Sequence, residues 1–222
     1  QESRGLGDVY KRQVEYLKEK SIPFKDSVYA SLDDLLSNQE KKDFEKLVGM
    51  NHSLAQTVKQ CKATISYPPN GLPMLLYGPT GTGKSLIAKL TYEWARNHGV
   101  IAKDGQFVQV NCSEYANNPE LLTANLFGHV KGAFTGAEKD NEGLIALADN
   151  GVLFLDEVHE LKAECQEKLF LFMDQGIYHR VGDNEKWYKS NVRIVFATTE
   201  NPDKVLLKTL MRRIPMTITI PS

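Results

Sequence analysis

Short apolar runs alternate along this chain with stretches in which apolar residues recur every three or four positions. The apolar runs lie at residues 74–77, 107–110, 152–155, 192–198 and 216–220. Such runs are typical of buried strands in a parallel sheet, because helices cover both faces of that sheet. Helical periodicity falls at residues 51–63, 85–96, 117–127, 141–148 and 161–174. This alternation predicts an α/β fold with a parallel five-stranded sheet between helices.

The first part of the chain departs from this pattern. Residues 1–39 are polar and lack sustained periodicity, so we interpret them as a poorly structured leader or linker. Within it, residues 1–13 (QESRGLGDVYKRQ) resemble translated sequencing-adapter read-through, and we set them aside as candidate foreign sequence. The folded core is expected over residues 40–222, with Asn51 or Ser53 capping its first long helix. The chain ends directly after the last expected strand, which predicts a fragment of a larger protein.

Composition narrows the class of protein. The chain has 222 residues, of which 41% are apolar and 25% charged, enough for a sizeable core. The formal net charge of −1 predicts neither a nucleic-acid nor a membrane partner. No apolar run approaches the ~18 residues of a membrane span and no secretory leader is visible, so a cytoplasmic protein is expected. Cys61, Cys112 and Cys165 lie far apart and are expected to be buried, reduced thiols.

A glycine-rich loop follows the first expected strand and opens a helix. It reads GPTGTGKS and fits the phosphate-binding pattern G-x-x-x-x-G-K-[ST] at every required position: Gly78, Pro79, Thr80, Gly81, Thr82, Gly83, Lys84 and Ser85, with Leu86 next. The glycines let backbone N–H groups approach phosphate oxygens. Lys84 would contact the β- and γ-phosphates, and the Ser85 hydroxyl would bind Mg²⁺. Strand, loop and helix N-terminus together predict a nucleotide site.

The third expected strand, VLFL, ends in two acidic residues. In a parallel sheet the carboxyl ends of the strands meet at one edge, so Asp156 and Glu157 should lie beside the phosphate loop. Asp156 would hold Mg²⁺ through its water shell. Glu157 would activate the attacking water as a general base. The alternative is an ordinary strand that ends in acidic residues.

Other positions carry weaker signals. Asn111 ends the second strand, where its amide could hydrogen-bond Glu157 or simply form a turn. Thr198 and Thr199 end the fourth strand, where a hydroxyl could orient water near the γ-phosphate. Arg212 and Arg213 suit either an interface between subunits or a solvated charged patch. His129 and His159 flank motifs without a second ligand at metal spacing, so surface or packing roles are expected for them.

The order of these motifs resembles the AAA+ domain of sigma-54-dependent transcriptional activators over about residues 44–222. The matching strings are GPTGTGKS, NC at 111–112, LFGHVKGAFTGA at 126–137, GVLFLDEV at 151–158, RVGD at 180–183 and VRIVFATT at 192–199. The resemblance implies an AAA+ P-loop NTPase core that uses ATP and Mg²⁺ in a homo-oligomeric ring, expected to be a hexamer. It also implies that GAFTGA (Gly132, Ala133, Phe134, Thr135, Gly136 and Ala137) contacts sigma-54 in the RNA polymerase holoenzyme. The glycines would leave Phe134 exposed, which favours a partner.

The resemblance assigns further roles and shows departures. It implies that Asn111 switches Glu157, that Phe44, Val48 and Gly49 pack around adenine, and that Arg212 or Arg213 reaches the γ-phosphate of a neighbouring subunit. The family usually has asparagine at Thr199, glutamate at Asn125, and an arginine where Leu206 and Lys208 lie. These features resemble the levanase-operon regulators, which implies phosphotransferase-type regulation. The family's helical lid is expected to be absent or truncated, and DNA contact to be made only by domains outside this chain.

The leading hypothesis is therefore an ATPase that remodels sigma-54 holoenzyme through the GAFTGA loop. Two alternatives stay open at this point. One is an AAA+ protein unfoldase or DNA-loading ATPase, with which Thr199 is compatible. The other is a catalytically weak ATP-sensing assembly module, which the missing arginine and Thr199 favour.

Overall fold

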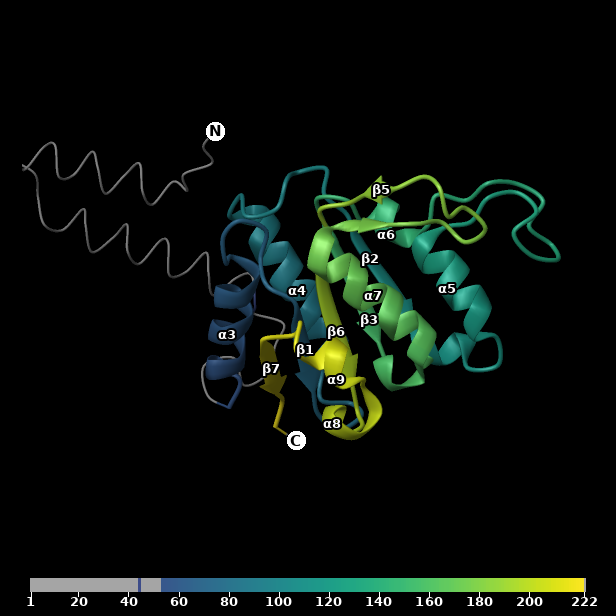
Figure 1. Ribbon diagram of the computed structural model, residues 1–222. Helices are drawn as coiled ribbons and strands as arrows, with labels where there is room; N and C mark the ends of the chain where they lie inside the picture. The colour runs from purple at the N-terminus through teal and green to yellow at the C-terminus, as the bar shows by residue number, and fades with distance from the viewer. Residues whose placement is uncertain (1–43, 45–52, 222) are drawn as a thin grey trace, which may run out of the picture.

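A computed structural model describes residue 44 and residues 53–221, and these residues confirm the parallel five-stranded sheet (Figure 1). The strand order is β2-β3-β6-β1-β7, and every neighbouring pair is parallel. The strands are β1 (Met74–Tyr77), β2 (Phe107–Asn111), β3 (Val152–Asp156), β6 (Arg193–Thr198) and β7 (Met216–Thr219). Their carboxyl ends share one edge of the sheet, where the loops carrying the predicted site residues begin.

Helices cover both faces of the sheet. On one side lie α3 (Ala55–Ile65) and α4 (Lys84–Asn97), and on the other lie α5 (Pro119–Phe127), α7 (Ala163–Gln175) and α9 (Lys208–Met211) (Figure 1). Two short helices, α6 (Leu144–Leu147) and α8 (Pro202–Val205), and two 3₁₀ turns, η1 (Cys112–Tyr115) and η2 (Val158–Glu160), complete the connections. Among the described residues, no helix is long and apolar enough to cross a membrane.

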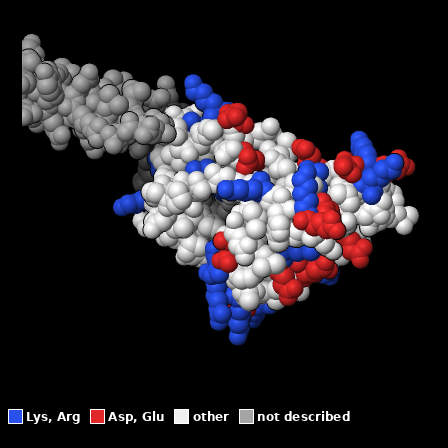
Figure 2. Space-filling model, turned by 45° about the horizontal axis from the view of Figure 1, so that its top comes forward, with Lys and Arg blue, Asp and Glu red and all other residues white. Residues whose placement is uncertain are grey.

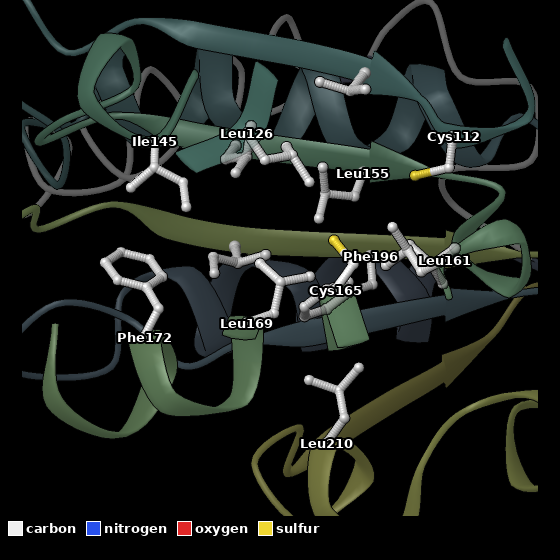
Figure 3. Close-up of a cluster of buried hydrophobic side chains, with 14 of the residues drawn as sticks. Cys112, Leu126, Ile145, Leu155, Leu161, Cys165, Leu169, Phe172, Phe196 and Leu210 are labelled. Atoms are coloured by element: carbon white, nitrogen blue, oxygen red, sulfur yellow. The ribbon is translucent and has the colours of Figure 1, made fainter. Parts of the chain in front are cut away.

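Successive side chains of each central strand belong to two separate apolar cores. In β1, Leu75 joins the core under α5 and α7, whereas Met74 and Leu76 join the core under α3 and α4. Figure 3 shows the first of these cores, in which Leu155 and Phe196 from the sheet face Leu169 from α7. The strands are buried on both faces for this reason, which explains why their sequences are uninterrupted apolar runs.

Several element boundaries differ from the prediction. The first long helix begins at Ala55, and its N-cap, Leu54, makes no side-chain cap, so the expected cap at Ser53 is wrong; Asn51 lies outside the described residues. Helix α6 starts only at Leu144, because Gly143 has a left-handed φ of 85° and Asn141 pairs with His129 instead of opening the helix. The boundary expected near residue 40 also lies outside the described residues.

The GAFTGA segment is joined at its base to a short β-hairpin. Strands β4 (Ile177–Tyr178) and β5 (Tyr188–Lys189) pair antiparallel and form this hairpin. Backbone bonds connect it to the GAFTGA segment: Val181 N donates to Gly128 O (2.9 Å) and Val130 N donates to Val181 O (3.1 Å). The GAFTGA segment extends beyond α5 beside the tip of this hairpin (Figure 1).

Candidate functional site

The phosphate loop joins β1 to α4 in the geometry that an anion site needs. Gly81 and Gly83 have φ values of 81° and 84°, a left-handed backbone conformation that residues other than glycine rarely adopt. Gly83 is the N-cap of α4 and supplies no side-chain cap, so the first N–H groups of the helix stay available to an anion. The buried Lys84 ammonium donates to the carbonyls of Gly78 (2.8 Å) and Pro79 (3.0 Å), which places its charge over the loop.

The predicted metal ligands meet although they are distant in sequence. The Ser85 hydroxyl at the start of α4 donates to Oδ2 of Asp156 at the end of β3, over 2.7 Å. The other Asp156 oxygen accepts from the backbone N–H of Glu157 (3.0 Å). Among the described residues, no three His, Cys, Asp or Glu side chains are grouped to hold a metal. A hydroxyl beside one carboxylate instead fits Mg²⁺, which usually keeps several waters and takes further oxygens from phosphates.

Glu157 has an unusual backbone and a defined set of side-chain partners. Its φ of 51° is left-handed, an uncommon conformation for a residue other than glycine that is often found at functional sites. Thr199 Oγ1 donates to Glu157 Oε2 over 3.1 Å. The ring of His159 places Nδ1 only 3.3 Å from the same oxygen. The carboxylate is therefore held by groups that follow β6 and β3.

The expected hydrogen bond between Asn111 and Glu157 is not formed in the structure. Asn111 Oδ1 accepts from the backbone N–H of Ser113 (3.1 Å) and from its hydroxyl (2.8 Å), so this side chain caps η1. The sheet register explains the difference, because Asn111 lies opposite Asp156, and Glu157 instead reaches Thr199.

His159 lies in the site, although the sequence led us to expect only a surface or packing role for it. Its ring is 20% exposed and lies among Glu157, Thr198 and Glu160, so it contacts the predicted general base. A histidine two residues after the acidic pair was the only signal in the sequence, and the absence of a second metal ligand argued against a role there. Sheet topology, which brings the end of β6 beside η2, supplies the missing information.

The residues predicted to pack around adenine fall partly outside the described residues. Val48 and Gly49, the residues predicted to pack around the base, lie outside the described residues, and Phe44 is fully buried against the core under α3 and α4. A cavity of about 420 Å³ opens beside the phosphate loop. Its lining consists of Ser53, Leu54, Pro79, Thr80, Gly81, Thr82 and Pro221. Leu86, in the first turn of α4, is 38% exposed.

The two candidate arginines differ in their environment. The Arg213 guanidinium pairs with Asp174 Oδ1 of α7 (2.6 Å) and lies 5.2 Å from the centre of the Phe170 ring. Within the part of the chain that the structure describes, Arg212 forms no ion pair or side-chain hydrogen bond and is exposed. Arg213 thus fixes α9 to α7, whereas Arg212 faces outward.

The GAFTGA segment forms a compact turn with an exposed aromatic residue. Gly132 N donates to Ala137 O (2.8 Å) and Ala137 N donates to Phe134 O (3.0 Å), while Ala137 itself is buried. Phe134 is 36% exposed, and its ring makes a T-shaped contact with the ring of His129, with 5.0 Å between ring centres. A cavity of about 710 Å³ separates this turn from α5 and α7.

Lysine, arginine, aspartate and glutamate side chains are interspersed over the face of the molecule in Figure 2, so this face offers no docking surface of a single sign of charge.

Comparison with known proteins agrees with these motifs. The sequence profile of the family described as "Sigma-54 interaction domain" matches residues 47–216. Transcriptional regulatory protein LevR of Bacillus subtilis (strain 168) is 52% identical over 178 residues, which are 80% of this chain and 19% of that protein. Transcriptional regulatory protein DagR of Salmonella typhimurium is 39% identical over 219 residues, which are 96% of this chain and 23% of that protein.

The chain thus spans about a fifth of the length of these relatives. Among solved structures, NtrX from Brucella abortus in complex with ADP superposes with a TM-score of 0.63 at 25% identity, over 90% of this chain and 44% of that one. The AAA+ core predicted from the sequence is confirmed by this match. The chain belongs to the family of sigma-54 interaction domains, which are AAA+ ATPase modules, and it is similar to regulators of the levanase-operon type.

Proposed function

We propose that this chain is the Mg²⁺-dependent ATP-hydrolysing module of a sigma-54-dependent transcriptional regulator. The observation that carries the proposal is the meeting of Ser85 and Asp156 at 2.7 Å, with Glu157 next in the chain. A nucleotide-binding protein without catalysis would need only the loop, the lysine and the metal ligands. A carboxylate fixed beside them supplies the base that hydrolysis requires.

Separate residues would bind the phosphates, hold the metal ion and accept the proton. The N–H groups at the start of α4 and the Lys84 ammonium would hold the β- and γ-phosphates. Mg²⁺, held by Ser85 and Asp156, would neutralise charge on those phosphate oxygens. Glu157 would accept a proton from water as its oxygen attacks the γ-phosphorus and the bond to the β-phosphate oxygen breaks.

The second half of the site would come from a neighbouring copy of the chain. An exposed arginine from that copy would stabilise the charge of the transition state, as arginine fingers do in other nucleotide hydrolases. Arg212 suits this role better than Arg213, because Arg213 is already paired with Asp174. The proposal therefore requires a homo-oligomeric ring, for which a hexamer is our expectation.

Hydrolysis would act on a protein partner through the GAFTGA turn. Glu157 and Asn111 lie at the ends of neighbouring strands, and η1 and α5 connect Asn111 to the GAFTGA segment. A change at the γ-phosphate would alter the population of turn conformations and the exposure of Phe134 and Thr135. The partner would be sigma-54 in the RNA polymerase holoenzyme, and phosphotransferase signals would reach the module through the rest of the regulator.

Co-elution with purified sigma-54 tests this proposal. The protein is mixed with sigma-54 and with ADP plus a metal fluoride, which mimics the transition state. Binding is expected only with the mimic, and Phe134→Ala should abolish binding while leaving ATP turnover intact. Normal turnover without any binding would point to another remodelling target, and binding without turnover would favour an ATP-sensing module.

A further inference from the structure

The side chains of Thr199 and His159 contact the predicted general base, Glu157. Thr199 Oγ1 donates to Glu157 Oε2 (3.1 Å), and His159 Nδ1 lies 3.3 Å from the same atom. The same nitrogen lies 3.2 Å from the hydroxyl of Thr198, which is fully buried at the end of β6. Both restraints act on one carboxylate oxygen and leave Oε1 of Glu157 outside this set of contacts.

The hydrogen-bond network determines which partner donates. The Thr198 hydroxyl accepts from the backbone N–H of Glu200 (3.1 Å) and directs its own hydrogen to the carbonyl of Glu200 (3.4 Å). Thr198 Oγ1 and the ionised Glu157 Oε2 are therefore both acceptors toward the ring of His159. We therefore assign the hydrogen to Nδ1, which donates it to Thr198 Oγ1 and lies 3.3 Å from Glu157 Oε2 as a polar contact without hydrogen-bond geometry.

The position of these groups indicates on which side of β3 Glu157 is held. Strand β6 lies between β3 and β1, and β1 leads directly into the phosphate loop. Thr198 and Thr199, which end β6, thus draw the carboxylate toward the phosphate loop. Asn111 ends β2 on the opposite side of β3 and is bonded to Ser113 instead.

We propose that His159 is a positioning residue for ATP hydrolysis, because its ring, anchored on Thr198 through Nδ1, lies 3.3 Å from Glu157 Oε2 and keeps that oxygen on the phosphate-loop side of β3. The inference rests on the proposed function, since it takes Glu157 as the general base. With Oε2 fixed by His159 and Thr199, the other oxygen of the carboxylate is free to accept the proton of the attacking water. Small errors in the position of a catalytic group lower rates strongly, so the loss of one restraint should be measurable.

The test compares His159→Ala with His159→Asn in steady-state ATP turnover. Asparagine can place its amide nitrogen near the position of Nδ1 and donate as the histidine does. His159→Ala is expected to lower kcat about 10-fold without changing KM for ATP, and His159→Asn to restore most of kcat. A Thr199→Val protein should also lose kcat, and the double variant should lose less than the product of the two effects, since both restraints serve one carboxylate. His179→Ala, in the hairpin between β4 and β5, is the matched control and should behave as the wild type.

Each outcome separates the inference from the proposed function. Wild-type turnover that Glu157→Gln abolishes supports the proposed function, whatever the histidine variants do. Unchanged or raised kcat in a folded His159→Ala protein would overturn the inference alone, and so would a raised KM that His159→Asn does not correct. Absence of turnover in the wild type would overturn both. Thermal melting and affinity for a non-hydrolysable ATP analogue verify that each variant is folded.

Discussion

The Ser85 hydroxyl donates a 2.7 Å hydrogen bond to Oδ2 of Asp156, across 71 positions of sequence. Strands β1 and β3, which lead to these two residues, are not neighbours, because β6 lies between them. The contact therefore passes beyond the carboxyl end of β6, where Thr198 and Thr199 lie. One sheet edge thus brings the phosphate loop, the acidic pair and the two threonines together.

This contact predicts how the metal affects nucleotide binding. Ser85→Ala and Asp156→Asn should each weaken binding of Mg²⁺–ATP by about 10-fold or more, because contacts to charged groups contribute roughly 1.5–3 kcal/mol. Binding of ATP in the presence of EDTA should change far less. Titration of a fluorescent ATP analogue with and without Mg²⁺ measures both affinities. Equal losses with and without the metal would contradict the assignment of Ser85 and Asp156 as metal ligands.

Replacing Glu157 should abolish ATP hydrolysis without weakening nucleotide binding. Glu157→Gln should keep its affinity for Mg²⁺–ATP but lose turnover by roughly 10²–10⁴-fold, the usual contribution of a general base. Lys84→Ala is the matched control, because it removes the charge over the phosphate loop and should lose binding itself. Isothermal titration and phosphate release measure the two properties. A Glu157→Gln protein with near-normal turnover would exclude this residue as the base.

Much of the sheet and part of the site could be predicted from the sequence. Apolar runs identified all five strands of the main sheet because each is buried on both faces, and the phosphate-loop pattern specified Lys84 and Ser85. The sequence pointed to Asn111 as the hydrogen-bond partner of Glu157, whereas the structure shows Thr199 in that position. The partner depends on strand order, because the threonines that end β6, and not the residue that ends β2, lie beside Glu157. His159 was missed for the same reason, and the short helices α8 and α9 were missed because few residues define their periodicity.

Gly182 should be required for the position of the GAFTGA turn. Its φ of 82° is left-handed, and a Cβ built on it would lie 2.7 Å from Cβ of Ala133. Gly182→Ala is therefore expected to displace the turn and to destabilise the protein by about 1 kcal/mol or more. Co-elution with sigma-54 should weaken while ATP turnover persists. Unchanged co-elution would show that the turn moves independently of the hairpin.

Because its cysteine thiols are buried, the protein should have a lower free energy of unfolding at high pH. Burial raises the pKa of the Cys61 thiol to about 12 and that of Cys165 to about 11, from an ordinary value of 9.0. The folded protein thus binds these protons more tightly than the unfolded chain, and the resulting stability is complete below pH 9 and is lost as pH rises toward the folded pKa.

Denaturant unfolding at several pH values tests this decline. Each cysteine can contribute a slope of up to about 1.4 kcal/mol per pH unit in that window, and Cys61→Ala should reduce the slope relative to the wild type. Below pH 9 neither thiol should react with Ellman's reagent until the protein unfolds. Rapid labelling of the folded protein at pH 8 would contradict the burial of these thiols.

Replacing Arg213 by alanine should mainly lower stability, whereas replacing Arg212 should mainly lower ATP turnover. Arg213 contributes an ion pair with Asp174 and a cation–π contact with Phe170, both within the chain. Because the pair is partly exposed, Arg213→Ala should lower the free energy of unfolding by only about 1 kcal/mol and leave much of the turnover. Arg212→Ala should keep its stability but lose turnover, because its guanidinium would act on the nucleotide of a neighbour.

A mixing experiment distinguishes action within a subunit from action between subunits. Arg212→Ala and Glu157→Gln proteins are each expected to be inactive alone. In a mixed ring, an Arg212→Ala subunit keeps Glu157 and can receive Arg212 from a Glu157→Gln neighbour, so turnover should reappear. If instead Arg213→Ala were inactive alone and turnover reappeared on mixing it with Glu157→Gln, the acting arginine would be Arg213, which would then have to leave Asp174 on assembly. Absence of recovery with either arginine variant would exclude catalysis between subunits by this pair.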